Sequence, residues 1–285
     1  MTAPLLSTPV DPDRQRAISA RRRRDVLVAS ISTVVFFGIL VGAVVTSPGW
    51  PAVQEFFFSP SDAKRALPEL VKVLWLTVAI FLTAEPVILV VALLLALLRG
   101  LRAPIFTPLR FVAVVYTDVV RGIPTILLIF LFAYGIPALE LQGLTHSALF
   151  WAWLALVVSY SAYVAEVLRA GLESVHPSQP AAARALGLGQ IQSLRYVVVP
   201  QAVRRVIPPL LNDFISLQKD TALVGIVGVV ELFKAAQIDI GLSYNFTSMV
   251  VAAAFYVAMT VPLSRYADWM SERQRKRSQA SGGAL

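Results

Sequence analysis

The side chains that could do chemistry in this chain are a few ionisable groups set within long apolar stretches. Glu85 stands beside Pro86, Arg121 precedes a Gly-Ile-Pro sequence, and Lys219 opens a Lys-Asp-Thr sequence. Ionisable groups are costly in lipid, and those that persist there usually face a bundle interior, pair with one another or line a polar path. Each of these residues therefore has a functional and a structural interpretation.

A polar stripe adds to this set. Ser159, Tyr163, Glu166 and Ala170 recur at spacings of four, three and four residues, which places them on one face of a helix. We expect that face to point into a helical bundle, because small and polar residues favour helix contacts in membranes. Glu166 either lines a cavity, where it attracts a cationic group, or pairs with Arg169.

The other ionisable groups leave similar alternatives. Pro86 frees a backbone carbonyl next to Glu85, so Glu85 either lines a path or belongs to a kink with a paired carboxylate. Arg121 either holds a carboxylate in a two-point contact or pairs with Asp118. The sequence Arg-Gly-Ile-Pro at 121–124 is also expected to interrupt what would otherwise be a helix from about Thr107 to Leu139. Lys219 either contacts a solute or maintains packing and gating.

Bond-making chemistry has few candidates in this sequence. The chain has no cysteine and only two histidines, His146 and His176, thirty residues apart. Disulfides, thiolate metal sites and a His-based triad are thereby excluded. No G-x-x-x-x-G-K-[ST] sequence is present, so the usual loop that cradles nucleotide phosphates is missing. We expect no catalytic residue, no metal and no cofactor.

The elements that must position these groups are membrane-spanning helices. With 57% hydrophobic and 15% charged residues, the composition lies outside the usual soluble range. A helix needs roughly 20 apolar residues to cross the hydrocarbon core of a membrane. Four uncharged windows reach that length and two more are interrupted by charges. We therefore predict an all-α polytopic membrane bundle with six spans: 26–46, 70–98, 122–139, 147–165, 206–230 and 243–264.

The basic residues predict the orientation of these spans. With the N-terminus inside, 19 of the 25 Lys and Arg residues fall on the cytoplasmic side, including Arg99, Arg102 and Arg110 of a loop at 99–110, as the positive-inside rule requires. Residues 1–25 then form a basic cytoplasmic arm and 271–285 a cytoplasmic tail. Because the net charge of +8 arises largely from these flanks, we expect contact with membrane lipid and not with nucleic acid.

One polar stretch, residues 178–200, is predicted to be cytoplasmic. It reads SQPAAARALGLGQIQSLRYVVVP, with Ser178 as an N-cap, a two-turn helix, a left-handed Gly187 and a second short helix that ends before Pro200. The stretch either lies on lipid headgroups as an amphipathic loop or docks against another protein. The apolar content of residues 181–186 is mostly alanine, which buries little area in lipid but allows close approach.

The same stretch resembles the cytoplasmic signature of ATP-binding-cassette (ABC) importer permeases. The family pattern is E-A-A, three residues, G, nine residues, I-x-L-P. Here A-A-A-R-A-L-G at 181–187 is followed after nine residues by V-V-V-P, with Ala181 where the pattern has glutamate. Three further sequences resemble the polar-amino-acid permeases of the histidine, glutamine and arginine type: RGIPTILLIFLFAYGIP (121–137), AYVAEVLRAGLESV (162–175) and PQAVRRVIPPLLNDFISLQKDTAL (200–223).

The resemblance covers about residues 70–270 and implies a five-span ABC importer permease core, to which 26–46 adds an extra first span. It implies that 178–200 couples the chain to an ATPase subunit through six residues: Ala181, Ala182, Ala183, Arg184, Gly187 and Pro200. A substrate pathway is also implied, in which a carboxylate meets an ammonium group and Arg121 a carboxylate. Its candidate residues are Glu85, Arg121, Tyr163, Glu166 and Lys219.

The expected function is that of the permease subunit of an ATP-driven importer for polar amino acids in the bacterial inner membrane. Expected partners are ABC ATPase subunits, a second permease chain, identical or homologous, and an extracellular solute-binding protein. The alternative is an ion- or proton-coupled secondary transporter, which Glu85 and Glu166 favour and the lack of a visible inverted repeat opposes. An intramembrane enzyme would need paired carboxylates, His or Cys, and here the carboxylates are scattered.

Overall fold

The computed structural model describes residues 12–101 and 103–282. It falls into two parts, residues 1–56 and 57–285, and each is described by itself. The first part contains α1 (Pro12–Val45) and most of α2 (Trp50–Phe57). Of the predicted basic arm and tail, residues 1–11 and 283–285 lie outside the described residues, as does Arg102 of the predicted 99–110 loop.

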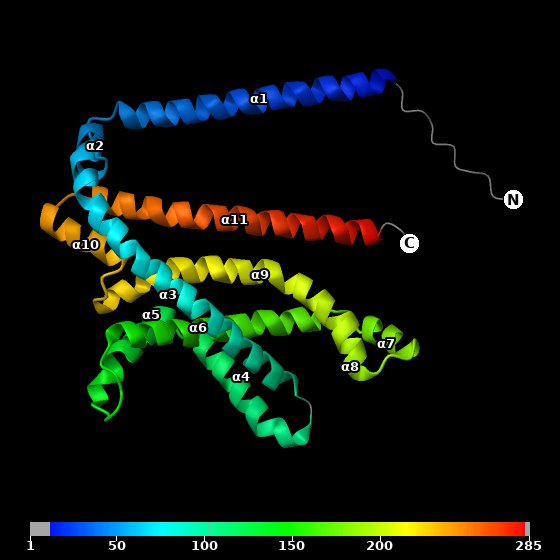
Figure 1. Cartoon of the computed structure of the whole chain (residues 1–285). Coiled ribbons are helices and arrows are strands. Elements are labelled where there is room, and N and C mark those ends of the chain that lie inside the picture. Colours follow the sequence, from blue (N-terminus) through cyan, green and yellow to red (C-terminus); the bar gives the residue numbers. More distant parts are fainter. Residues whose placement is uncertain (1–11, 102, 283–285) are drawn as a thin grey trace. The chain divides into compact units, whose positions relative to one another are not determined.

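Every regular element in the described residues is helical, which confirms the predicted all-α class. The second part is a bundle of helices joined by short turns (Figure 1). Its α-helices are α3 (Pro60–Gly100), α4 (Thr107–Gly122), α5 (Thr125–Phe130), α6 (Ala148–Glu173), α7 (Ser178–Ala185), α8 (Gln190–Ser193), α9 (Val199–Asp220), α10 (Leu232–Ser243) and α11 (Thr247–Gly282).

The membrane-length stretches agree with the predicted spans in part. Four described stretches are long and apolar enough to cross a membrane: Arg23–Val45, Trp50–Gly100, Ala148–Glu173 and Thr247–Arg273. Two bent pairs pass the same test only when each pair is taken as one span: Pro104–Gly122 with Thr125–Leu139, and Gln190–Val227 with Leu232–Ser243. The predicted count of six membrane spans is reached only if each bent pair is taken as one span.

The predicted span 122–139 is wrong as a separate span. After α5 the chain continues through a π-helical turn (Leu131–Gly135) and a 3-10 turn (Pro137–Leu139), and Thr125–Leu139 reaches membrane length only together with Pro104–Gly122. The chain bends by 104° between the end of α4 at Gly122 and the start of α5 at Thr125. Ile123 and Pro124 have extended ψ values of 127° and 132°. The cause is local, because the residue before a proline is pushed out of the helical region and proline has no N–H to donate. The expected interruption at 121–124 is confirmed.

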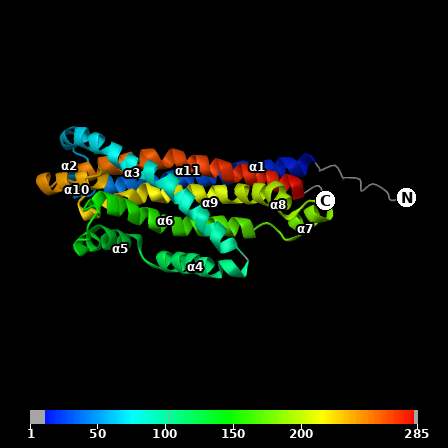
Figure 2. The ribbon, with the colours of Figure 1, turned by 60° about the horizontal axis from the view of Figure 1, so that its bottom comes forward.

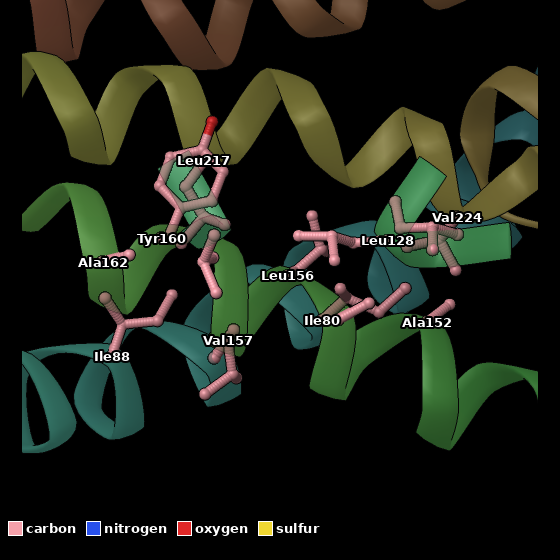
Figure 3. Packing of buried hydrophobic residues seen from close by; sticks show 14 of the residues in the cluster. Ile80, Ile88, Leu128, Ala152, Leu156, Val157, Tyr160, Ala162, Leu217 and Val224 are labelled. Carbon is pink, nitrogen blue, oxygen red and sulfur yellow. The ribbon is translucent and has the colours of Figure 1, made fainter. Parts of the chain in front are cut away.

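Helix α6 is central to the second part. It packs against α3, α4, α5 and α9, and both ribbon views show it running beside α9 (Figures 1 and 2). Its buried face carries small residues that let neighbouring helices approach closely, namely Ala152, Ala155, Ser159, Ala162 and Ala165. Figure 3 shows the apolar cluster around it, where Leu156 lies with Ile80 of α3 and Leu217 of α9.

A smaller cluster joins α3, α10 and α11 at the end of the bundle that is predicted to face outward. Leu70, Leu232 and Ala252 are buried together there. Beside them, the guanidinium of Arg65 lies 3.3 Å from the carboxylate of Asp239. Residues that the charge distribution assigns to the same side of the membrane therefore lie at the same end of the bundle.

Residues 178–200 fold into two helical pieces around a tight turn. Gly187 has a φ of +90°, the left-handed conformation that was predicted for it. The predicted cap is wrong: Pro177 occupies the N-cap position, and the Ser178 hydroxyl instead forms a 2.7 Å hydrogen bond with His176 Nδ1. A serine that follows Pro177 in helical conformation is already inside the first turn, so its side chain cannot cap that turn.

The second helix is expected to end before Pro200, and this expectation is wrong. From α8 the chain continues through a π-helical turn at Leu194–Val198 directly into α9, with Pro200 in the first turn of that helix. Proline is tolerated at this position because the first N–H groups of a helix have no partner within it. One nearly continuous helix therefore leads from the polar turn into the bundle.

Candidate functional site

A cluster of charged side chains gathers around Glu166 on α6. Its Oε2 atom lies 2.9 Å from Nη1 of Arg99, on the last turn of α3, and 3.7 Å from Nη1 of Arg121, at the end of α4. Arg169, one turn along α6, is salt-bridged to the same carboxylate and to Glu173. Three guanidinium groups thus share one carboxylate, which joins three helices at the predicted cytoplasmic end of the bundle.

The polar stripe on α6 faces the break between α4 and α5. The Tyr163 hydroxyl donates a 3.3 Å hydrogen bond to the backbone carbonyl of Arg121, and the Arg121 guanidinium lies 5.8 Å from the centre of the Tyr163 ring. On the other side of the break, Thr125 Oγ1 and Ser159 Oγ are 2.8 Å apart. The stripe therefore contacts residues both before and after the break. Its predicted inward orientation is confirmed for the buried Ser159 and the half-buried Tyr163 and Glu166, and is wrong for Ala170, which is exposed.

One alternative for Glu166 was a pair with Arg169, and the structure contains this salt bridge. The alternative for Arg121 was a pair with Asp118. Among the described residues its ion pair is with Glu166 instead. The Arg121 side chain is 38% exposed, against 12% for Arg99. Arg121 therefore keeps guanidinium donors that a further carboxylate can reach.

Glu85 and Lys219 lie apart from this cluster. Among the described residues, no hydrogen bond or ion pair links either one to Arg121, Tyr163 or Glu166. Glu85 is half-buried on α3. Lys219 is exposed. The structure thus brings together three of the five predicted pathway residues.

The neighbourhood of Lys219 is polar although Lys219 itself is exposed. Tyr160 of α6 donates a 2.8 Å hydrogen bond to Asp220 Oδ2, and Figure 3 shows its hydroxyl pointing away from the apolar cluster toward α9. Asp213, two turns earlier on α9, has a buried Oδ2 without a hydrogen-bond partner in the described part of the chain. α9 therefore presents carboxylates to the interior at two levels.

Sequence reasoning missed Arg99 and Glu231. Arg99 was counted only as a basic loop residue, whereas it lies on α3 and also donates a 2.8 Å hydrogen bond to Thr117. Glu231 is fully buried and caps α10 by accepting the backbone N–H groups of Phe233 and Lys234, each at 2.8 Å. An acidic residue just before a helical pattern was the available signal for Glu231.

The turn between α7 and α8 carries strongly exposed apolar side chains at the predicted cytoplasmic end. Leu186 is 85% exposed and Ile191 80% exposed. Of the predicted coupling residues, Ala181, Ala182, Arg184, Gly187 and Pro200 are exposed and Ala183 is buried. In the described residues, no group of three His, Cys, Asp or Glu side chains could hold a metal ion.

A bundle of membrane-length helices with an interior polar cluster and an exposed helical turn at one end is the architecture of a polytopic transport protein. The chain belongs to the family of binding-protein-dependent transport system inner membrane components, whose family model matches residues 89–276. The resemblance inferred from the sequence is thereby confirmed.

Curated relatives and a solved structure agree with this family. The chain is 33% identical to the probable glutamine ABC transporter permease protein GlnM of Bacillus subtilis, over 62% of this chain and 81% of that protein. It is 36% identical to GlnP of the same organism, over 62% of this chain and 80% of the relative. A crystal structure of an amino acid ABC transporter with histidines matches with a TM-score of 0.69 and 30% identity, covering 75% of this chain and 98% of that one.

Proposed function

We propose that this chain is the permease subunit of an ATP-driven importer of polar amino acids in a bacterial inner membrane, with both termini in the cytoplasm. The observation that carries the proposal is the exposed α7–α8 turn in a chain of this family, held at the shared end of α6 and α9 (Figure 1). Amino acids are proposed as substrates because the relatives are named as glutamine permeases and the similar solved structure as an amino acid transporter.

The proposed assembly contains two ABC ATPase subunits, a second permease chain, identical or homologous, and an extracellular solute-binding protein. Since this sequence has no phosphate-binding loop, the energy comes from the ATPase partner. The partner docks at 178–200, and the binding protein delivers the solute at the opposite end. The extra span 26–46 and the arm 1–25 precede the permease core in the sequence.

The proposed substrate pathway runs past Glu85, Arg121, Tyr163, Glu166 and Lys219. Arg121 is the best group for the substrate carboxylate, because it has the longest contact with Glu166 and the more exposed side chain. Glu166 then holds the arginines in place, and Glu85 is the carboxylate available to an ammonium group.

The coupling assignment is tested at Gly187. A side chain there meets open space, but its φ of +90° strains most residues. Gly187→Trp, which is both strained and bulky, should abolish ATP-driven uptake while the protein remains in the membrane. Gly187→Asn is the matched control, because asparagine tolerates the left-handed conformation and is small. Normal uptake by the Trp variant in proteoliposomes would end the assignment.

The pathway assignment is tested at Arg121 and Glu166. Arg121→Gln and Glu166→Gln should raise the half-saturation concentration for uptake, while the ATPase subunits still copurify. If both variants transported with unchanged rate and affinity, the cluster would be structural and the pathway would lie nearer Glu85. Uptake that persisted without the ATPase would favour the ion-coupled alternative.

A further inference from the structure

The α7–α8 turn and the helices that flank it are basic and apolar, without any acidic residue. Between Glu173 and Asp213 the sequence contains four arginines and no Asp or Glu. At the turn itself, Leu186 and Ile191 are 85% and 80% exposed. A surface that combines protruding apolar side chains with charge of one sign is complementary to a partner with apolar pockets and opposite charge.

Helix α7 has an inner and an outer face. Ala183 is buried, and its backbone carbonyl accepts a 3.2 Å hydrogen bond from the N–H of Leu188 after the turn. Ala181, Ala182 and Ala185 are exposed. Because their side chains are single methyl groups, a partner's backbone can approach this outer face closely.

Two arginines flank these apolar groups. Arg184 Nε donates a 3.3 Å hydrogen bond to the Pro180 carbonyl, and the Arg195 guanidinium lies 5.8 Å from the centre of the Tyr196 ring. Both side chains are exposed, and within the described residues neither forms a salt bridge with a carboxylate. Each guanidinium has five N–H donors, so most of them are free to bind carboxylate oxygens of a partner.

The outer alanine face favours a protein over lipid headgroups as this partner, because methyl groups bury little area in lipid, and the geometry places the turn outside the hydrocarbon core. Helix α6 has 26 residues, so it is roughly 39 Å long, against about 30 Å for the hydrocarbon core. Its last two turns carry the charged residues Glu166, Arg169 and Glu173. α7 follows beyond that charged end, and Figure 2 shows α7 and α8 past the ends of α6 and α4. The turn is therefore held away from the hydrocarbon.

We propose that the partner presents an apolar pocket for Leu186 and Ile191 whose rim carries carboxylates that pair with Arg184 and Arg195. This inference rests on the proposed function, in which the partner is an ATPase subunit. Ala181 contributes to the selectivity, because a glutamate there would put a negative charge one turn from Arg184 and repel an acidic rim. This permease thus selects an ATPase with an acidic docking groove.

The test uses the detergent-purified complex of this permease with the ATPase that supports its ATP-driven uptake. The ATPase retained per permease is measured from about 50 to about 500 mM KCl, a range in which screening grows strongly. Arg184→Glu and Arg195→Glu should each weaken retention about tenfold at low salt. Arg110→Glu, an exposed arginine on α4, is the matched control and should leave retention unchanged. Reversal of a rim carboxylate to lysine in the ATPase should restore binding of Arg184→Glu.

Three outcomes overturn the acidic groove. If both arginine reversals retain the ATPase normally while Leu186→Asp abolishes retention, the ATPase docks here through apolar contacts alone and the proposed function stands. If Gly187→Trp, Leu186→Asp and Arg184→Glu all retain it normally, the docking assignment of the proposed function fails as well. If Arg184→Glu affects only uptake in vesicles that contain anionic phospholipid, the arginines contact lipid headgroups.

Discussion

The contact between α6 and α9 near the coupling segment gives a prediction whose size follows from the structure. A Cβ atom at Gly171 would lie 1.9 Å from Cγ1 of Val206 and 3.5 Å from the carbonyl oxygen of Ala202. Val206 is 5% exposed, and its branched side chain has few alternative rotamers in a helix. Gly171→Ala should therefore push the two helices apart.

Two opposing effects determine the expected magnitude. Alanine in place of a helical glycine normally stabilises by about 1 kcal/mol. Overpacking of a buried contact costs about 1–3 kcal/mol, and here a separation of 1.9 Å has to grow toward ordinary contact beyond 3.4 Å. The two effects together give a net loss of up to about 2 kcal/mol. Gly241→Ala in α10 is the matched control, because nothing lies within 4 Å of its added Cβ, so only the stabilising effect applies.

The assay measures thermal inactivation of the purified protein together with ATP-driven uptake in proteoliposomes. Gly171→Ala should lower both, and Gly171→Ala with Val206→Ala should recover both relative to the single variant, because the added methyl then occupies the space that valine vacates. Gly241→Ala should equal or exceed the wild type. If Gly171→Ala were as stable as Gly241→Ala, or if Val206→Ala gave no recovery, the close approach of α6 and α9 would not be what limits this position.

Three further predictions follow from single contacts or from the charge distribution. Arg99→Gln removes a 12% exposed guanidinium from Glu166 and should destabilise by about 1–3 kcal/mol in thermal inactivation; an unchanged profile would show that Arg169 and Arg121 satisfy the carboxylate without Arg99. Gly225→Ala would place a Cβ 2.4 Å from the Glu231 side chain and should destabilise by a similar amount. Stability equal to the wild type would show that the Glu231 side chain, which caps α10, can move aside at little cost. In this cysteine-free chain, Ser61→Cys should react with an impermeant thiol reagent in intact cells and Ser278→Cys should not; the reverse pattern would invert the topology.

The features that the sequence predicted correctly depend on neighbours along the chain. The break at 121–124 follows from proline chemistry within two residues, and the left-handed Gly187 follows from the helix stop that only glycine adopts freely. The stripe on α6 follows from helical periodicity. Two predictions at 178–200 were wrong, the Ser178 cap and the helix end before Pro200. The local rules do not predict that Pro177 is helical or that a π-helical turn continues the helix up to Pro200.

The features that the sequence did not predict depend on contacts between distant residues. Arg99 and Glu166 are 67 positions apart, and no local pattern distinguishes Arg99 from the other basic residues near span ends. Positive charge near a span end satisfies the topology rule whether the side chain faces water or turns inward to a carboxylate. Only the packing of α3 against α6 determines which of these occurs.

Glu166 is already paired with arginines, and this determines which pathway residue can bind which part of a substrate. A carboxylate that two guanidiniums already contact within hydrogen-bonding distance has little negative charge left to attract an ammonium group, so Glu166 is a weak recognition group while Arg99 and Arg169 hold it. Arg121 is different, because its 3.7 Å contact with that shared carboxylate is the longest of the three and its side chain is partly exposed. A substrate carboxylate can therefore compete for Arg121 without disrupting the Arg99–Glu166 pair that joins α3 to α6. For the same reason Glu166→Gln, which weakens that pair, should destabilise the protein more than Arg121→Gln, even where both variants raise the half-saturation concentration.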